Sequence, residues 1–350
     1  MDVRLSSEQQ AIRASAAQVV DQLGPRAVGQ LDDLERADKL DAAIAAAGWR
    51  ELRMAEADGE PLASGVEAAL IGEELGRGLA DAPFLGPTLA AELRRLAGAE
   101  PATTAETVAF VPSLAGPALA ADGRLADGAV AIDAHGIGSA LLFLSTGAGR
   151  VLAEVALGPA DVRTDLTRPT AIVDPATPVS IVVTVDRKSF PLGDDALAGW
   201  TALGLALTCA DLVGTMRGAM DLTVGYAGSR RQYGRPIGSF QAVQHLLADA
   251  LVLMEGSRSV ALHAAWAVDA LPARDALGAA AVAKAYCARA ARTVCETAIQ
   301  VHGGIGNTWE CLAHVYLRRA LLSSEVLGGA GASLDRVLAH HGIGANHGLQ

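Results

Sequence analysis

The chain has few cysteines, no excess of basic residues and no CxxC pair, and each absence excludes a class of protein. Its cysteines lie in helical-looking sequence at Cys209, Cys287, Cys295 and Cys311, so neither a disulfide framework nor a zinc site is indicated. Acidic residues number 39 against 28 basic ones, for a net charge of -11. Binding to a nucleic-acid backbone generally needs a large basic patch, and the sequence has no Lys/Arg cluster of that size, so we expect no nucleic-acid partner.

The sequence also lacks the features of export, membrane insertion and metal binding. The first eight residues contain no apolar core of a signal peptide, and the most apolar run, 196–210, ends at Asp211 before it reaches membrane-spanning length. The histidines near the C-terminus have neither an i,i+4 arrangement nor carboxylate neighbours, so we predict no metal there. The 350 residues are 51% hydrophobic, which predicts a soluble globular protein with a sizeable core. Because neither a signal peptide nor a membrane span is predicted, we expect a cytoplasmic protein without membrane contact.

The N-terminal segment has apolar residues at helical spacing. Ser6 or Ser7 can cap a first helix that Gly24-Pro25 ends. Further Ala-rich helical segments are predicted at about 41–47, 66–79 and 85–96.

From about 104 to 185 the sequence pattern changes to short runs rich in β-branched residues, separated by Gly, Pro and Asp. This pattern predicts a small antiparallel sheet. Beyond Leu192 long periodic helices continue nearly to His341. The chain is therefore predicted to be α+β, mainly α. We expect three domains: an N-terminal helical domain (1–103), a shortened middle β domain (104–190) and a C-terminal helical bundle (191–350).

Two polar segments in the C-terminal part have the chemistry to hold a bulky, doubly phosphorylated cofactor. In the first, Arg230 and Gln232 open a turn through Tyr233-Gly234, just ahead of a predicted helix. A guanidinium presents a planar fork of donors to phosphate oxygens, and a Gln amide can both donate and accept at adenine or ribose edges. The second segment is Gln300-Val-His-Gly-Gly-Ile-Gly306.

The glycines of the second segment do not form a dinucleotide-binding fingerprint. Gly304-Ile-Gly306 follows a helix-like segment, 288–301, instead of a strand, and the third glycine of the fingerprint is missing. The alternative is a tight turn between helices, where absent side chains let the backbone approach a cofactor. Glycine serves packing in such turns as often as function.

Taken together, the two segments resemble the flavin-binding half of the acyl-CoA dehydrogenases. The family motif Gln-x-x-Gly-Gly-x-Gly corresponds to the second segment, at a similar distance after the arginine motif. The resemblance extends over nearly the whole chain and implies the family fold with a C-terminal four-helix bundle, FAD as cofactor, an acyl-CoA substrate and an electron-transfer flavoprotein as electron acceptor. The family's Gln and second Gly, which contact the ADP part of a flavin bound mostly by a neighbouring subunit, match Gln300 and Gly304. The rest of the site would be lined by Arg230, Gln232, Tyr233, Ile237, Phe240 and Val243.

The expected catalytic base is missing. Acyl-CoA dehydrogenation needs a carboxylate that removes the α-proton while hydride leaves the β-carbon for flavin N5. The family places this glutamate at either of two positions, which by ungapped counting fall on Leu327 and near Gly204. Two acidic candidates remain, Glu310 and Glu325. Glu310 is spaced i,i+4 from His314 on an expected helix face, which is more often solvated than catalytic, and Glu325 points away from the direction of Leu327, so the catalytic residue stays unassigned.

The middle portion also lacks the family's Thr-Glu-Pro-x-x-Gly-Ser-Asp-like loop and Trp-Ile-x-Asn-Gly-like strand, which cradle the isoalloxazine ring. In the family, short chains without the glutamate are partners of full-length chains in α2β2 assemblies that often accept steroid or other bulky CoA thioesters. The leading hypothesis is such a subunit, which contributes the ADP side of a shared flavin site while the partner supplies the base. The alternatives are a self-sufficient homo-oligomeric dehydrogenase using Glu310 or Glu325, and a non-catalytic scaffold or acyl-CoA-binding protein.

Overall fold

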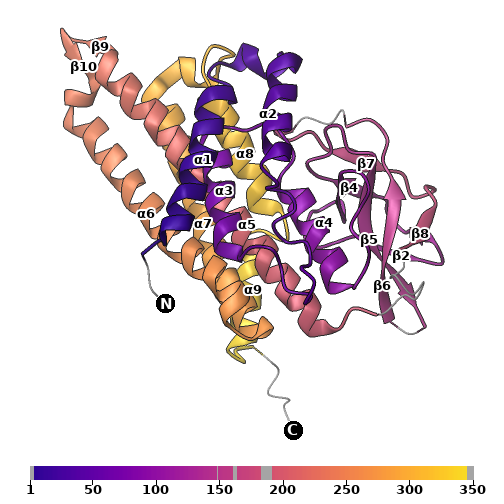
Figure 1. Cartoon of the computed structure of the whole chain (residues 1–350). Coiled ribbons are helices and arrows are strands. Elements are labelled where there is room, and N and C mark those ends of the chain that lie inside the picture. Colours follow the sequence, from indigo (N-terminus) through magenta and orange to yellow (C-terminus); the bar gives the residue numbers. More distant parts are fainter. Residues whose placement is uncertain (1–3, 148, 161–163, 183–190, 345–350) are drawn as a thin grey trace.

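The computed structural model describes residues 4–147, 149–160, 164–182 and 191–344 (Figure 1). An N-terminal group of helices covers one side of a long helical bundle, and a small sheet lies against one end of both. The N-terminal elements are α1 (Ser7–Leu23), η1 (Val28–Asp32), α2 (Leu34–Ala46), α3 (Gly65–Arg77) and α4 (Leu85–Leu96).

Helix starts in this region follow local capping chemistry. Ser6 caps α1, and its side chain and that of Gln9 each accept a hydrogen bond from the other's backbone N–H. Helix α2 begins well before the predicted position, because Asp33 accepts a hydrogen bond from Arg36 N and caps it. Helix α3 then packs directly on the bundle, since a Cβ added to Gly214 of the bundle would overlap the Glu73 carbonyl group.

The middle region forms a mixed sheet, so the prediction of an antiparallel sheet was wrong. Strands β1 and β2 both pair with β5 in parallel, and the remaining pairs are antiparallel. The chain reverses between β1 and β4 and again before β5, so β5 returns in the direction of β1. The strands are β1 (Glu106–Phe110), β2 (Leu119–Ala121), β3 (Arg124–Leu125), β4 (Ala129–Ala131), β5 (Ser139–Thr146), β6 (Gly149–Ala156), β7 (Ala171–Val173) and β8 (Val179–Ile181). The strand predicted at 181–185 lies mostly outside the described residues.

Long helices dominate the rest of the chain, as predicted. The elements are α5 (Asp194–Ser229), β9 (Arg231–Gln232), β10 (Arg235–Pro236), η2 (Ile237–Ser239), α6 (Gln241–Ala270), α7 (Ala273–His302), η3 (Gly303–Asn307), α8 (Ala313–Glu325) and α9 (Ala330–His340). The β9–β10 hairpin and the adjoining end of α6 project beyond the body of the molecule (Figure 1).

Helix α5 is the central element of the bundle. It is long and apolar enough to cross a membrane by length and composition alone, but 72% of its most apolar window is buried inside the protein. The helix continues past Asp211, where the apolar run ends. The carboxylate of Asp211 can be buried there because it is paired with Arg319 of α8. Trp200 of the same helix donates its indole N–H to Leu89 O of α4 at 3.0 Å, which ties the bundle to the N-terminal helices.

Candidate flavin site and catalytic positions

The arginine motif forms a short hairpin at the end of α5. The Arg230 N–H donates to Tyr226 O, and the Arg230 carbonyl accepts from Ile237 N, both at 2.8 Å, so the hairpin closes directly on the helix end. Its two-residue loop has positive φ at Tyr233 (52°) and Gly234 (78°), the geometry of a tight hairpin turn. Tyr233 adopts this backbone at some strain, and 92% of the residue is exposed.

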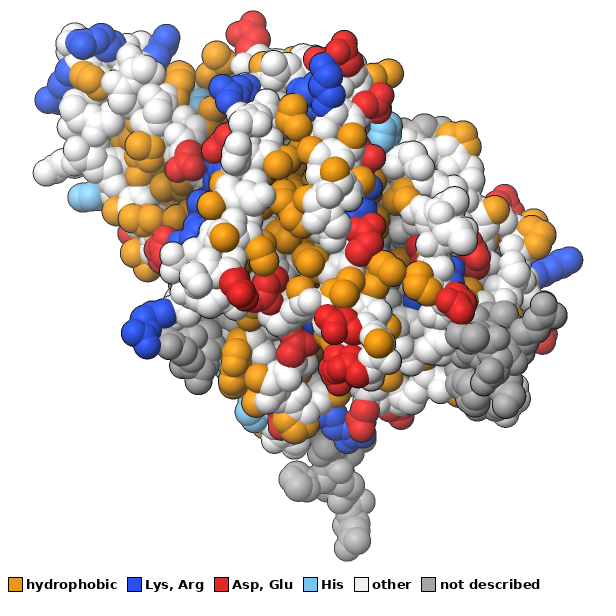
Figure 2. All heavy atoms as spheres, in the orientation of Figure 1, with side chains coloured by type: hydrophobic (Ala, Val, Ile, Leu, Met, Phe, Trp, Pro, Cys, Tyr) orange, Lys and Arg blue, Asp and Glu red, His pale blue; other side chains and the backbone are white. Residues whose placement is uncertain are grey.

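The side chains expected to hold the cofactor lie on the outside of this projection. Arg230, Gln232 and Tyr233 are exposed, whereas Ile237, Phe240 and Val243 are half-buried. Arginine side chains gather at the hairpin tip in the space-filling view (Figure 2). Within the described residues, the side chains of Arg230 and Gln232 have no hydrogen-bond or ion-pair partner, so their donors are available to another molecule.

The hairpin carries an aromatic platform beside these donors. The Arg235 guanidinium lies 4.3 Å from the centroid of the Phe240 ring, and the Tyr233 ring approaches the same ring edge-on, with centroids 6.2 Å apart. Such contacts stabilise ring orientation by about 0.5–1.5 kcal/mol each. Phe240 is therefore held in one position at the start of α6.

The second motif caps α7. Gly303 has φ +68°, which ends the helix, and η3 follows. Gly306 packs tightly, because a Cβ there would lie 3.0 Å from both Ile299 O and His302 Cβ. Gly304 differs, since its φ is not left-handed and an added Cβ would meet nothing within 4 Å. The protein's own fold therefore gives no reason for glycine at 304, and that bare face is open to an outside molecule.

The fold brings the two motifs to the same end of the bundle. The rings of Tyr226, one turn before Arg230, and His302, next to Gly303, are stacked with centroids 4.4 Å apart. Gln300 is exposed, and its side-chain amide has no hydrogen-bond partner among the described residues. A guanidinium, two amides and a bare glycine fit the phosphates, ribose and base of an ADP group. The donor set thus agrees with the nucleotide end of FAD.

The two positions of the family's glutamate meet in space. Leu327 lies in the turn between α8 and α9, with 1% of the residue exposed. A Cβ added to Gly204 of α5 would overlap Leu327 Cδ1, so the leucine side chain occupies the space above the glycine. The Leu327 N–H donates to Leu114 O at 2.7 Å, which holds the turn against the loop between β1 and β2. An apolar contact stands where a base is expected.

Neither acidic candidate lies in this contact. Glu310 is exposed in the turn before α8, which begins at Ala313, so the expected shared helix face with His314 does not exist. The chain leaves the helix at η3 and only re-enters it after residue 312, which the i,i+4 spacing does not reveal. Glu325 is exposed at the end of α8, and its carboxylate lies over Gly329.

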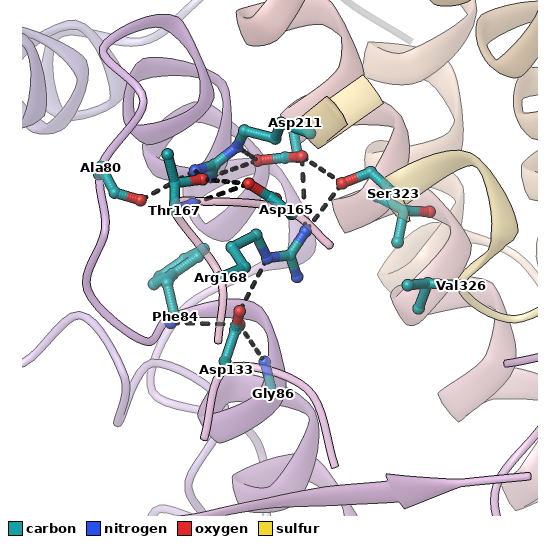
Figure 3. Close-up of polar contacts among 12 residues, drawn as sticks. Ala80, Phe84, Gly86, Asp133, Asp165, Thr167, Arg168, Asp211, Ser323 and Val326 are labelled. Carbon is teal, nitrogen blue, oxygen red and sulfur yellow. Dashed lines mark hydrogen bonds and ion pairs between the residues drawn. The ribbon is translucent and has the colours of Figure 1, made fainter. Parts of the chain in front are cut away.

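A buried network of charges fills the junction between the sheet, α5 and α8 (Figure 3). Arg168, from the segment before β7, donates to Asp133 Oδ1 and to Ser323 Oγ, both at 2.7 Å. Arg319 of α8 donates to Asp211 of α5 at 2.9 and 2.6 Å. Ser323 Oγ donates to Asp211 Oδ2 at 2.6 Å, so the network is continuous across the junction.

The network is nearly balanced in charge. Burial opposes ionisation of Asp211, but Arg319 and Arg168 outweigh it and lower the pKa of this carboxyl. Burial raises the pKa of Asp165, and the same two arginines offset this only in part. Two guanidiniums thus face three carboxyls. Burial also opposes ionisation of Asp133, but its neighbours, chiefly Arg168, outweigh it and lower the pKa of this carboxyl like that of Asp211. The adjoining cavity holds about 10 Å³, room for about one water molecule.

Lys284, which the sequence analysis did not single out, lies beneath the Leu327 turn. Its ammonium group donates to Thr208 Oγ1 at 3.0 Å and to the carbonyl oxygens of Ser323 and Val326 at 2.5 and 3.0 Å. Burial lowers its pKa to about 8. The sequence signal that could have identified it is a single lysine among the alanines of the buried face of α7. It fixes the end of α8 from within.

Comparisons with known proteins decide the family. A model described as the acyl-CoA dehydrogenase C-terminal domain matches residues 202–342. Over 270 residues, 75% of this chain and 73% of the relative, the protein is 33% identical to acyl-CoA dehydrogenase IpdE2 of Mycobacterium tuberculosis. The chain belongs to the acyl-CoA dehydrogenase family. Acyl-CoA dehydrogenase IpdE2 of Mycolicibacterium smegmatis is also 33% identical, over 78% of each chain.

Solved acyl-CoA dehydrogenase structures confirm the predicted fold. The ChsE4-ChsE5 complex from Mycobacterium tuberculosis matches with a TM-score of 0.79 and 24% identity over 98% of this chain and 99% of that one. The Tcur3481-Tcur3483 steroid ACAD G363A variant gives 0.77 and 24% over 96% and 98%. Family membership makes the protein an FAD-dependent acyl-CoA dehydrogenase, which confirms the expected enzyme class and cofactor.

Proposed function

We propose that this protein is one subunit of a heteromeric acyl-CoA dehydrogenase, and that this subunit lacks the catalytic base. It binds the ADP side of a FAD whose ring lies in a full-length partner, and the partner supplies the glutamate for α,β-dehydrogenation of a CoA thioester. Electrons then leave through an electron-transfer flavoprotein. The observation that carries the proposal is the packing of Leu327 on Gly204, because it puts an apolar contact at both positions that the family gives to the base.

In this proposal the chain's own residues bind and orient the cofactor. FAD, when bound, supplies the hydride acceptor. Arg230 holds the phosphates, and Gln232 and Gln300 contact the edges of the adenine and the ribose. Charge-assisted hydrogen bonds from a guanidinium to phosphate are about twice as strong as neutral ones, so Arg230 contributes most.

The closed junction beside the sheet supports a division of labour between two chains. Leu114, in the loop between β1 and β2, is bound to the Leu327 turn, and Arg168 and Asp211 are neutralised within the buried network. Placing a flavin ring at this junction would leave these buried charges unpaired, and a buried charge that loses its partner costs about 3–5 kcal/mol. The reactive ring therefore belongs in the partner.

Relatives support the heteromeric assembly and a bulky substrate. ChsE4-ChsE5 is a complex of two chains, and Tcur3481-Tcur3483 is a steroid ACAD. Both match this chain over at least 96% of its length. We therefore propose an α2β2 assembly with a steroid-like or similarly bulky CoA thioester as substrate.

Co-expression with a full-length acyl-CoA dehydrogenase homologue tests the proposal. The purified complex should be yellow and should oxidise acyl-CoA, whereas the chain alone should do neither. A Glu→Gln change at the partner's base should abolish turnover and retain FAD. Arg230→Ala should lower FAD content, and Arg274→Ala, an exposed arginine at the far end of α7, should not. Stoichiometric FAD and turnover by the chain alone would refute the proposal.

A further inference from the structure

A pair of stacked rings connects the two flavin motifs. The centroids of Tyr226 and His302 are 4.4 Å apart, and the ring planes meet at 22°. Tyr226 lies in the last turn of α5 and His302 is the last residue of α7, so the stack joins the ends of two helices. Both side chains line a cavity of about 470 Å³ between α5 and the segment that leads into α8.

Tyr226 is coupled to the hairpin through its backbone. Its carbonyl oxygen accepts hydrogen bonds from Arg230 N at 2.8 Å and from Ser229 Oγ at 3.1 Å. The Arg230 carbonyl in turn accepts from Ile237 N, which closes the hairpin. Tyr226 therefore supplies the backbone acceptor that anchors the hairpin to the helix end, and the ring of the same residue packs in the stack.

His302 is coupled in the same way to the glycine turn. Its Nδ1 donates to Ala298 O at 2.8 Å, which fixes the ring against α7. The turn folds back on the same residue, since a Cβ on Gly306 would lie 3.0 Å from His302 Cβ. His302 is therefore packed against the turn that carries Gly304.

We infer that the Tyr226–His302 stack is a positioning device for the cofactor. It keeps the hairpin donors, Arg230 and Gln232, in fixed register with the turn, so that one nucleotide contacts both. Neither ring has to touch FAD. A preorganised site binds more tightly because less ordering is needed on binding. This inference rests on the proposed function. It adds Tyr226, which precedes the arginine motif, and His302, which fills an unspecified position of the second motif.

The test measures FAD affinity in the complex with the full-length homologue. The complex is stripped of flavin and titrated with FAD, and the dissociation constant is read from flavin fluorescence. Tyr226→Leu removes the ring and should raise the Kd by roughly 3- to 10-fold, the range set by the energy of stacked aromatic pairs. Tyr226→Phe keeps the stack and should stay within about twofold of the wild type. At saturating FAD, the KM for acyl-CoA should be the same in all three proteins.

Two further variants separate the possible failures. If Tyr226→Leu binds FAD as tightly as the wild type while Arg230→Ala binds it weakly, the positioning role is overturned and the proposed function stands. If Arg230→Ala also binds FAD normally, the proposed function itself fails. His302→Leu repeats the test from the other side of the stack should Tyr226→Leu not fold, and normal FAD affinity in that variant likewise overturns the inference.

Discussion

Replacing Gly204 by alanine tests the contact that closes the base position. Alanine is favoured over glycine inside a helix by about 1 kcal/mol, so the substitution would stabilise α5 if the space above it were open. The new Cβ would instead overlap Leu327 Cδ1, and overpacking of this kind costs about 1–3 kcal/mol. The helix gain offsets part of this cost, so we expect Gly204→Ala to lower the free energy of unfolding by up to about 2 kcal/mol.

The sign should reverse when Leu327 is shortened. Leu327→Ala alone should cost about 2–5 kcal/mol, because the leucine is almost completely buried. In that background Gly204→Ala should stabilise the protein by up to about 1 kcal/mol, which gives a coupling of about 1–3 kcal/mol. Urea unfolding of the four proteins of this cycle, followed by circular dichroism, measures it. An equal effect of Gly204→Ala in both backgrounds would refute the contact.

Three further predictions concern groups around this contact. Asp165→Asn should stabilise the protein at pH 7 and have no effect below about pH 4, because the raised pKa of Asp165 makes its ionisation costly in the folded state; a less stable variant at pH 7, measured by urea unfolding, would contradict this. Between pH 8 and 10.5 the free energy of unfolding of the wild type should rise by up to about 3 kcal/mol relative to that of Lys284→Met. The reason is that the folded pKa of about 8 lies below the unfolded value, so the cost of the buried charge is relieved across this window. If the free energies of unfolding of the two proteins change in parallel with pH, Lys284 is not a buried ammonium. Glu310→Gln and Glu325→Gln should leave turnover of the complex within about twofold, since neither lies in the Gly204–Leu327 contact; loss of activity with FAD retained in either variant would identify a base in this chain.

Features coded by short stretches of sequence were predicted well. Helix α4 has the predicted bounds of 85–96, and α1 lies between the predicted cap Ser6 and the predicted stop at Gly24. The hairpin that carries Arg230 and Gln232 also forms where the Tyr233-Gly234 turn predicts it. Capping and turn formation depend on neighbouring residues, so a single sequence shows them.

Features that depend on distant pairs were missed. Strand composition does not encode direction, so the parallel pairing of β1 with β5 left no local signal. The buried network joins Asp133, Arg168 and Asp211 over separations of tens of residues, and each alone looks like an ordinary charged residue. In contrast, counting along the family motifs placed Leu327 and Gly204 at the base positions, and the structure packs them together.

The central claim is that this chain holds one half of a flavin site and no base. Native mass measurement with flavin counted per chain tests it directly. The account predicts a colourless species for the chain alone, and a heteromer with a full-length homologue whose FAD is lost in Arg230→Ala. A homo-oligomer that carries one FAD per chain and dehydrogenates acyl-CoA without any partner would contradict it.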